Sequence, residues 1–320
     1  MKKFLLILFV FVLIVGLITA AINGLYLYND RKTPDTMSSD RDNDAQIKNV
    51  PSGIQLCNFG SSHGLYGFDY KNVEDSFICY NFGQTSQFIS YDYRILQNYI
   101  YNFDKGAVVF ITISHFSLFG PPDITYENFA SLNKRYYKFL EDDLIKEYDA
   151  KTDFFVNYAP SLVSDDIVSL FEGLLGIHSS GSWHEMTDAQ AAAEHAYKRY
   201  SVFIKEKLDE NGERLYNEEE IAALYDMIAL CQDRGLVPIL VTTPYLSEYN
   251  DSVRENDPEF YDDFYSLIDK VVSDTGVRYF DYSCDPRFID DYSLFYNTDH
   301  LNCNGAQKFT DILIEETRCI

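Results

Sequence analysis

The chain has 320 residues, of which 46% are hydrophobic and 16% aromatic, and its formal net charge is −24 at pH 7. This composition excludes a disordered protein, because the chain holds enough apolar side chains to build a core. The negative charge repels phosphate backbones and anionic lipid headgroups. We therefore expect no nucleic-acid binding, and any membrane association needs a hydrophobic anchor.

The N-terminal segment provides such an anchor. Two lysines precede an uncharged apolar run from Phe4 to about Ile22, and a run of roughly 20 apolar residues matches the hydrocarbon thickness of a bilayer. Lysines on this side favour a cytoplasmic N-terminus, with the rest of the chain outside the cell membrane. The sequence predicts a single-pass anchor over residues 1–28. A cleaved signal peptide and a secreted product are the alternative.

Residues 29–50 are rich in Asp, Arg, Ser, Lys and Asn, which predicts a solvated tether. Residues 51–320 then form the main domain. Of the six cysteines, Cys57, Cys79 and Cys231 lie in apolar segments, where a buried thiol is usual. The remaining candidates for disulfide pairing are Cys284, Cys303 and Cys319, and the sequence leaves their pairing open.

Strand and helix patterns alternate along the main domain. Short apolar runs predict strands at 53–58, 76–81, 107–113, 237–243 and 277–282. Amphipathic patterns with caps and stop residues predict helices at 217–235, 258–275 and 305–317. This order predicts an α/β fold with a doubly wound, mainly parallel five-stranded sheet in three layers, of flavodoxin-like type.

More than a hundred residues separate the third and fourth predicted strands. Helix patterns occur there near 125–148 and 187–208, the second with a capping box formed by Thr187 and Gln190. So long a crossover predicts a helical insertion over about residues 120–215, which would serve as a lid or substrate-binding cap.

Polar clusters follow the first three strands and precede the last helix, at residues 60–63, 83–86, 114–117 and 297–302. Ligands of doubly wound sheets bind beyond the carboxyl ends of the strands, so these clusters are expected to meet. A serine becomes a nucleophile beside a histidine base, and backbone N–H groups near glycine stabilise an oxyanion. Ser62, His300 and Gly83 supply these three kinds of group.

The layout resembles the SGNH (GDSL-like) hydrolase superfamily. Gly60-Ser61-Ser62 after the first strand is similar to its Gly-Asp-Ser-type motif, and the stretch 299–306 resembles the bacterial cell-envelope branch. That branch includes proteins of teichoic acid D-alanylation and exopolysaccharide O-acetylation. The resemblance implies Ser62 as the nucleophile and His300 as the base, with Ser62 N–H and Gly83 N–H binding the oxyanion.

Two positions depart from the family pattern. The triad acid usually stands three residues before the histidine, where this chain has Asn297, and Asp299 is the alternative acid. An amide can orient a histidine but cannot compensate its charge. The oxyanion asparagine after the third strand also has no counterpart, and Ser114 or His115 are candidates to support the site instead.

We expect no cofactor and no metal. The histidines of the crossover, His178, His184 and His195, match no familiar ligand spacing, and His184-Glu185 lacks the second histidine of a zinc helix. The leading hypothesis is a serine-dependent esterase or O-acyltransferase acting on an acylated envelope or extracellular glycan. The alternative hypothesis is a non-catalytic binding or partner subunit of an envelope polysaccharide modification assembly.

Overall fold

The computed structural model describes residues 2–38, 45–120, 133–160 and 188–317, except for the side chain of residue 206. The chain divides into two compact units. One unit comprises residues 1–34 and 127–182, and the other comprises residues 35–126 and 183–320.

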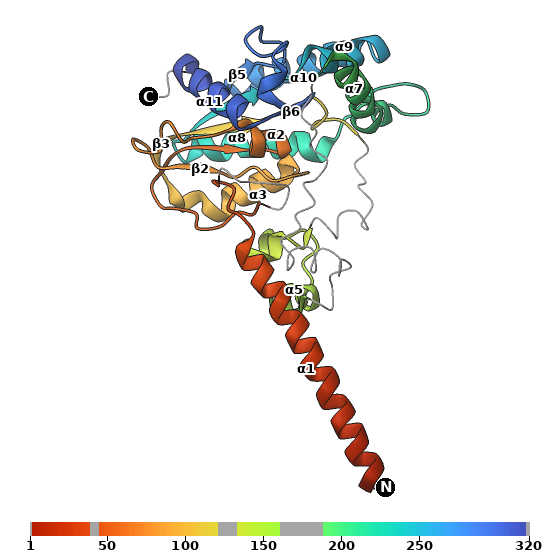
Figure 1. Ribbon diagram of the computed structural model, residues 1–320. Coiled ribbons are helices and arrows are strands. Elements are labelled where there is room, and N and C mark those ends of the chain that lie inside the picture. Colours follow the sequence, from red (N-terminus) through yellow and green to blue (C-terminus); the bar gives the residue numbers. More distant parts are fainter. Residues whose placement is uncertain (1, 39–44, 121–132, 161–187, 318–320) are drawn as a thin grey trace. The chain divides into compact units, whose positions relative to one another are not determined.

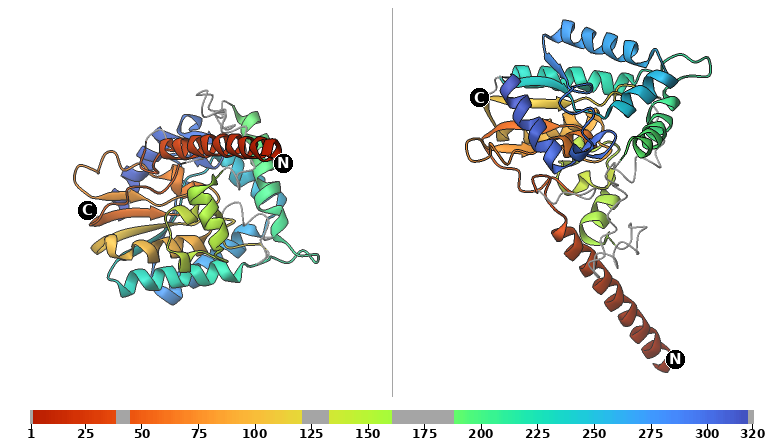
Figure 2. Two further views of the ribbon diagram at one scale, coloured as in Figure 1. Left: turned by 90° about the horizontal axis from the view of Figure 1, so that it is seen from below. Right: turned by 45° about the horizontal axis from the view of Figure 1, so that its top comes forward.

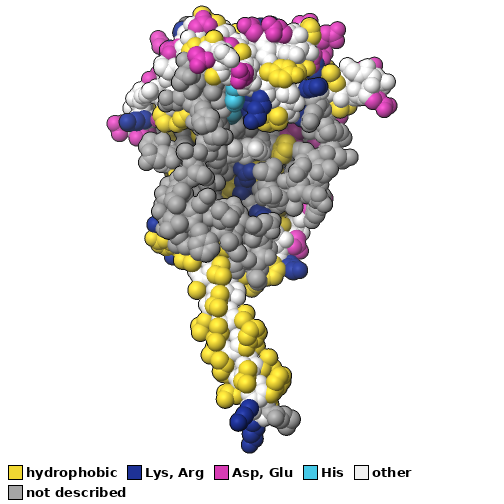
Figure 3. Space-filling view, turned by 45° about the vertical axis from the view of Figure 1, so that its right-hand side comes forward, with side chains coloured by type: hydrophobic (Ala, Val, Ile, Leu, Met, Phe, Trp, Pro, Cys, Tyr) yellow, Lys and Arg dark blue, Asp and Glu magenta, His cyan; other side chains and the backbone are white. Residues whose placement is uncertain are grey.

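The first unit contains the N-terminal helix α1 (Lys2–Lys32). None of its residues is buried, and an 18-residue window has a mean hydropathy of 3.2, so the helix is long and apolar enough to cross a membrane. Figure 3 shows hydrophobic side chains along its surface and basic side chains at its tip. A span of this kind also suits a signal sequence, as the sequence allowed.

The described crossover residues of this unit differ from the expected helix at 125–148. They form two short 3-10 turns, η2 (Tyr136–Lys138) and η3 (Asp142–Leu144), followed by helix α5 (Ala150–Tyr158). Asn133 donates to the backbone oxygen of Lys146 (2.8 Å), which folds this part of the chain back on itself. The prediction of one long helix is therefore wrong over residues 134–148. Residues 125–132 lie outside the described part.

The second unit is built on a five-stranded, wholly parallel sheet with the order β2-β1-β3-β4-β5 (Figure 1). The strands are β1 (Ile54–Phe59), β2 (Cys79–Asn81), β3 (Phe103–Thr112), β4 (Val237–Thr242) and β5 (Arg278–Asp281). The predicted α/β fold and all five strands are confirmed. Cys57, Cys79 and Cys231 are buried as expected, whereas Cys284 and Cys303 are exposed and Cys319 lies outside the described residues.

Helices cover both faces of the sheet (Figure 2, left). Helices α2 (Ser62–Gly67) and α11 (Cys303–Thr317) pack together on one face. Helices α3 (Ile89–Tyr99), α8 (Glu218–Asp233) and α10 (Phe260–Thr275) contact one another in series on the other. The remaining elements are η1 (Ile100–Asn102), α7 (Ala189–Phe203), η5 (Lys205–Lys207), α9 (Ser247–Asn256), η6 (Tyr292–Leu294), β6 (Phe295–Asn297) and β7 (His300–Leu301).

The expected solvated tether is wrong in part. Thr36, Ala45 and Ile47 are at most 3% exposed. The Thr36 hydroxyl donates to the backbone oxygen of Asn81 (2.5 Å), and the backbone N–H of Lys48 donates to the Tyr80 hydroxyl (2.9 Å). Since β2 is the edge strand of the sheet, this polar segment covers an edge that would otherwise be open to other chains.

The helix predicted near 187–208 exists as α7, but its cap is different. Asp188 precedes the helix, and its carboxylate accepts from the backbone N–H of Ala191 (2.9 Å). Thr187 lies outside the described residues, and the amide of Gln190 donates to Glu194 (3.2 Å). The predicted capping box is therefore wrong, because the neighbouring acid fills the same role.

Helix α3 begins without a capping side chain of its own. The buried carboxylate of Glu220 in α8 takes this role, since it accepts from both the backbone N–H (2.9 Å) and the hydroxyl (2.7 Å) of Ser90. Helix α3 also carries Asp92, whose carboxyl accepts from the backbone N–H of Gly60 at the end of β1 (3.0 Å). The cap thus supports the helix that holds the turn after β1.

We predict that Glu220→Ala lowers the free energy of unfolding by about 2–3 kcal/mol, because two buried donors lose their acceptor. Urea denaturation of the full chain measures the change. Glu218→Ala is the matched control, since it removes an exposed carboxylate from the same helical turn. Equal losses in the two variants would contradict a capping role for Glu220.

Candidate functional site

Ser62 is the first residue of α2 and stands directly beyond the carboxyl end of β1. The turn requires glycine at position 60, because φ there is +136° and a Cβ would lie 2.7 Å from the Thr112 side chain at the end of β3. Ser62 is half-buried, and its backbone N–H makes no hydrogen bond to another described residue. Both the hydroxyl and the backbone N–H of Ser62 are therefore available to a bound molecule.

The Ser62 hydroxyl lies 2.8 Å from Nε2 of His300, and Nδ1 of His300 lies 2.9 Å from Oδ1 of Asn297. The same Asn297 atom accepts the backbone N–H of Asp299 (3.1 Å), which identifies it as the amide oxygen. His300 Nδ1 must therefore carry the proton, and Nε2 accepts from Ser62. The three side chains form one hydrogen-bonded chain from Ser62 through His300 to Asn297.

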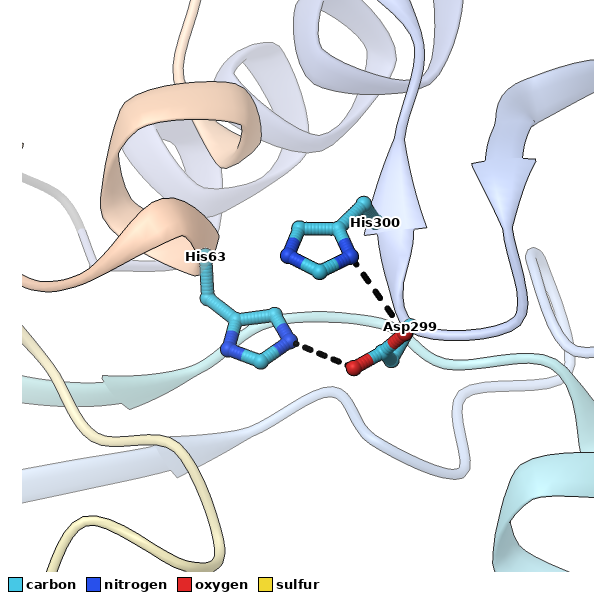
Figure 4. A group of neighbouring side chains, drawn as sticks. All are labelled: His63, Asp299 and His300. Carbon is cyan, nitrogen blue, oxygen red and sulfur yellow. Dashed lines mark hydrogen bonds and ion pairs between the residues drawn. The ribbon is translucent and has the colours of Figure 1, made fainter. Parts of the chain in front are cut away.

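Asp299 lies beneath this arrangement as a fully buried carboxylate. Its Oδ2 accepts from Nε (2.8 Å) and Nη2 (2.5 Å) of Arg199 in α7, and lies 3.3 Å from His63 Nε2. Its Oδ1 lies 3.3 Å from His300 Nδ1. Figure 4 shows both imidazoles pointing one nitrogen toward this carboxylate. Burial alone would raise the pKa of Asp299, but Arg199 and His300 hold it well below its usual range.

His63 continues a second chain of hydrogen bonds. Its ring stacks on that of His300, with centroids 4.5 Å apart and planes inclined by 9°. Its Nδ1 lies 2.5 Å from the Ser114 hydroxyl, which lies 3.2 Å from the Ser61 hydroxyl. Two serine–histidine chains, one ending at Ser62 and the other at Ser61, therefore meet at one carboxylate.

Burial lowers the pKa of His300 to about 3, although Asp299 works in the opposite direction. The imidazole is therefore neutral across the physiological pH range. Nε2 can accept the Ser62 proton, and the resulting imidazolium is formed beside Asp299.

Gly83 is required by a close approach, because a Cβ at this position would lie 2.3 Å from the backbone nitrogen of Leu65 in α2. The Gly83 N–H, expected to bind an oxyanion, donates to Oδ1 of Asn81 (2.9 Å). The described geometry thus places Gly83 beside the Ser62 helix with its amide engaged. The role of this amide as an oxyanion donor remains a prediction.

The two candidates after β3 have different surroundings. Ser114 joins the site through His63. His115 is fully buried among aromatic rings, including those of Tyr245, Tyr261 and Phe264, and neither of its ring nitrogens has a hydrogen-bond partner among the described residues. Burial lowers the pKa of His115 to about 4.

His63, Asp299 and His300 are close enough to suggest a metal site. The stacking argues against one, because ring lone pairs in two parallel planes cannot converge on a single ion. Arg199 also occupies Asp299. His195 is not part of this group, and its Nδ1 lies 2.8 Å from the Thr298 hydroxyl. His178 and His184 lie outside the described residues.

Sequence reasoning did not assign roles to His63, Ser61 or Arg199. The first two stand beside Ser62 in the chain and could have been considered on that ground alone. Arg199 follows His195 by four residues in α7, so the two share a helix face, and both contact the segment that precedes β7. That spacing was the available signal for the crossover's contribution to the site.

We predict that His115→Phe flattens the dependence of stability on pH. The pKa of His115 is about 4 in the folded state and about 6.5 in an unfolded chain. Its neutral burial therefore contributes stability above pH 6.5 that is lost as pH falls toward 4, by up to about 3 kcal/mol. Urea denaturation at pH 7 and pH 4.5 measures the loss in each protein.

His115→Gln serves as the control, because it also removes the titrating group but keeps a polar side chain. It should flatten the same pH dependence while lowering stability at pH 7. A pH dependence in both variants as steep as that of the wild type would refute this assignment.

Comparison with models of protein families gives no match, and no curated protein matches the chain at a significant level. The site's own geometry is therefore the basis for a function.

Proposed function

We propose that the protein is a serine-dependent, SGNH-like enzyme that cleaves or transfers an acyl ester, with Ser62 as the nucleophile and His300 as the base. The observation that carries the proposal is the pair of hydrogen bonds joining Ser62 to His300 (2.8 Å) and His300 to Asn297 (2.9 Å). A hydroxyl, a neutral imidazole with a defined tautomer and an orienting group are the parts of this chemistry.

In the proposed reaction, Ser62 Oγ attacks the acyl carbon as its proton moves to His300 Nε2. The C–O bond to the leaving alcohol then breaks, and His300 returns the proton to that oxygen. Water or a second hydroxyl attacks the acyl-enzyme, with His300 again taking the proton. The Ser62 N–H is the amide available to the oxyanion, because it makes no other hydrogen bond in the described structure.

Asn297 and Asp299 divide the work of the usual triad acid in this proposal. Asn297 holds the His300 ring by a hydrogen bond, whereas Asp299 supplies negative charge 3.3 Å from Nδ1. When His300 becomes an imidazolium, this charge stabilises it, which a neutral amide alone would not do.

The proposed substrate is an acylated glycan or other ester outside the cell membrane. Helix α1 would anchor the chain, with its N-terminal lysines on the cytoplasmic side and the α/β unit outside. Release after cleavage of α1 as a signal peptide is the alternative location. The resemblance of residues 299–306 to envelope proteins supports this substrate class.

A second candidate is a non-catalytic subunit that binds a glycan or a partner in an envelope modification assembly. The engagement of the Gly83 N–H by Asn81 favours it, because an expected oxyanion donor is occupied. A fluorophosphonate probe distinguishes the two, since only an activated serine reacts. Failure of the folded wild-type chain to become labelled would support the binding subunit.

We predict that Ser62→Ala and His300→Ala each lower the turnover of p-nitrophenyl esters by at least about 10³-fold, because nucleophile and base act as a unit. The assay uses the full chain in detergent micelles, and the proposed anchor predicts that activity stays in alkali-washed membranes. Ser247→Ala is the matched control, since Ser247 is also the first residue of a helix. Full activity in Ser62→Ala would exclude the mechanism.

The pH profile provides an independent prediction. Since burial holds the pKa of His300 at about 3, kcat/KM should show no loss of the base between pH 8 and pH 5. In Asn297→Asp, a carboxylate beside Nδ1 raises the pKa of His300 by about 1–3 units, so the rate begins to fall at correspondingly higher pH as acid is added.

Asn297→Ala is the control for that profile. It removes the hydrogen bond without adding charge, so the rate should fall at every pH with no new acid limb. A wild-type limb near pH 6.5 would contradict the proposed environment of His300.

A further inference from the structure

The hydrogen-bond chain through His63 has a defined direction. Asp299 is ionised and only accepts, so His63 Nε2 must donate to it. In the tautomer that carries its hydrogen on Nε2, His63 offers Nδ1 as an acceptor. The Ser114 hydroxyl, 2.5 Å away, therefore donates to His63.

The direction of the hydrogen bond between Ser114 and His63 also determines the direction of the next one, between Ser61 and Ser114. Because the Ser114 hydrogen points to His63, its oxygen accepts the hydrogen of the Ser61 hydroxyl, 3.2 Å away. Ser61 is half-buried, whereas Ser114 is only 1% exposed. The chain therefore ends in a hydroxyl whose hydrogen is directed inward and whose remaining lone pair is available to a donor.

Ser61 lies beside the nucleophile. It is adjacent to Ser62 in the chain, and the two histidines to which these serines connect are stacked with centroids 4.5 Å apart. Each ring points one nitrogen to Asp299 and the other away from it (Figure 4). Two hydroxyl–imidazole chains therefore lie side by side in this site, with His300 Nε2 and Ser61 Oγ as their acceptor atoms.

Building on the proposed function, we propose that Ser61 Oγ is the second acceptor for the attacking water, which makes this site selective for hydrolysis over transfer. Water has two O–H groups, so it donates one to His300 Nε2 and the other to Ser61 Oγ. An alcohol has one, which it must give to His300 to react. Only water satisfies both acceptors.

The step balances. The water oxygen forms a bond to the acyl carbon as one of its protons passes to His300 Nε2. The bond between that carbon and Ser62 Oγ then breaks, and His300 returns the proton to Ser62. The second water hydrogen stays on the product carboxylic acid and is lost to solvent. Ser61, Ser114 and His63 bind and orient without changing their own protonation.

The test is the partition of the acyl-enzyme between water and methanol. The full chain in detergent reacts with p-nitrophenyl acetate in a series of methanol concentrations, and NMR measures acetate against methyl acetate. Ser61→Ala should keep the burst of p-nitrophenol that reports acylation of Ser62. Its partition should shift toward methyl acetate by about tenfold, the value of one hydrogen bond.

Two further variants separate this role from a structural one. Ser61→Thr keeps the hydroxyl and should restore the wild-type partition. Ser114→Ala frees the Ser61 hydrogen to turn outward and should shift the partition in the same direction as Ser61→Ala.

An unchanged partition in Ser61→Ala, or equal losses of hydrolysis and methanolysis, would overturn the inference while leaving the serine mechanism intact. Absence of both the burst and fluorophosphonate labelling in the wild type is a different result. It would reject the proposed function itself, and this inference with it.

Discussion

The buried carboxylate of Asp299 is the charge on which the candidate site depends. A carboxylate removed from water is strongly unfavourable unless it is paired and hydrogen-bonded. Here the partners come from three separate elements: Arg199 from α7, His63 from α2 and His300 from β7. Satisfying this one charge therefore holds α7, α2 and β7 against one another.

The parallel sheet brings these elements together. Strands β1 and β3 are neighbours, so the turns that carry Ser61 and Ser114 leave the same edge. The close approach at Gly83 fixes α2 against the end of β2, and Gly60 lets the chain turn beside Thr112. Each of these is a short-range steric requirement. Together they position the backbone of α2, on which Ser62 is the first residue.

The strands and the Ser62–His300 pair were predictable because both leave local signals: apolar runs bounded by glycine, and polar clusters at strand ends. The orientation of His300 was left open between Asn297 and Asp299, and both residues face it in the structure. Arg199 was not predictable in its role, because an arginine on an amphipathic helix is usually solvated. Only the long-range pairing with Asp299, a hundred residues away, gives it one.

Long-range contacts, which leave no local signal in the sequence, also explain why the prediction of a solvated tether was wrong in part. The polar composition of residues 29–50 indicates solvent, yet Thr36 and Lys48 use their polar groups to cover the edge of β2. Composition carries only local information about a segment. An open strand edge arises from the tertiary fold, and its unpaired backbone groups can be covered by a segment of any composition. The observed N-cap of α7 is one residue after the predicted one. Serine, threonine and aspartate are near-equivalent caps, so the local sequence pattern cannot choose between neighbouring residues of these types.

The division of labour between Asn297 and Asp299 has a consequence for the strength of the base. A single carboxylate that both binds and compensates a histidine raises the pKa of that histidine strongly. In this site the amide makes the hydrogen bond, and the carboxylate is shared with Arg199, so its charge only partly offsets the effect of burial on the pKa of His300. Burial then dominates and the pKa falls to about 3. In the proposed reaction, an imidazole of this kind accepts the Ser62 proton less readily than an ordinary histidine and returns it more readily to the leaving group.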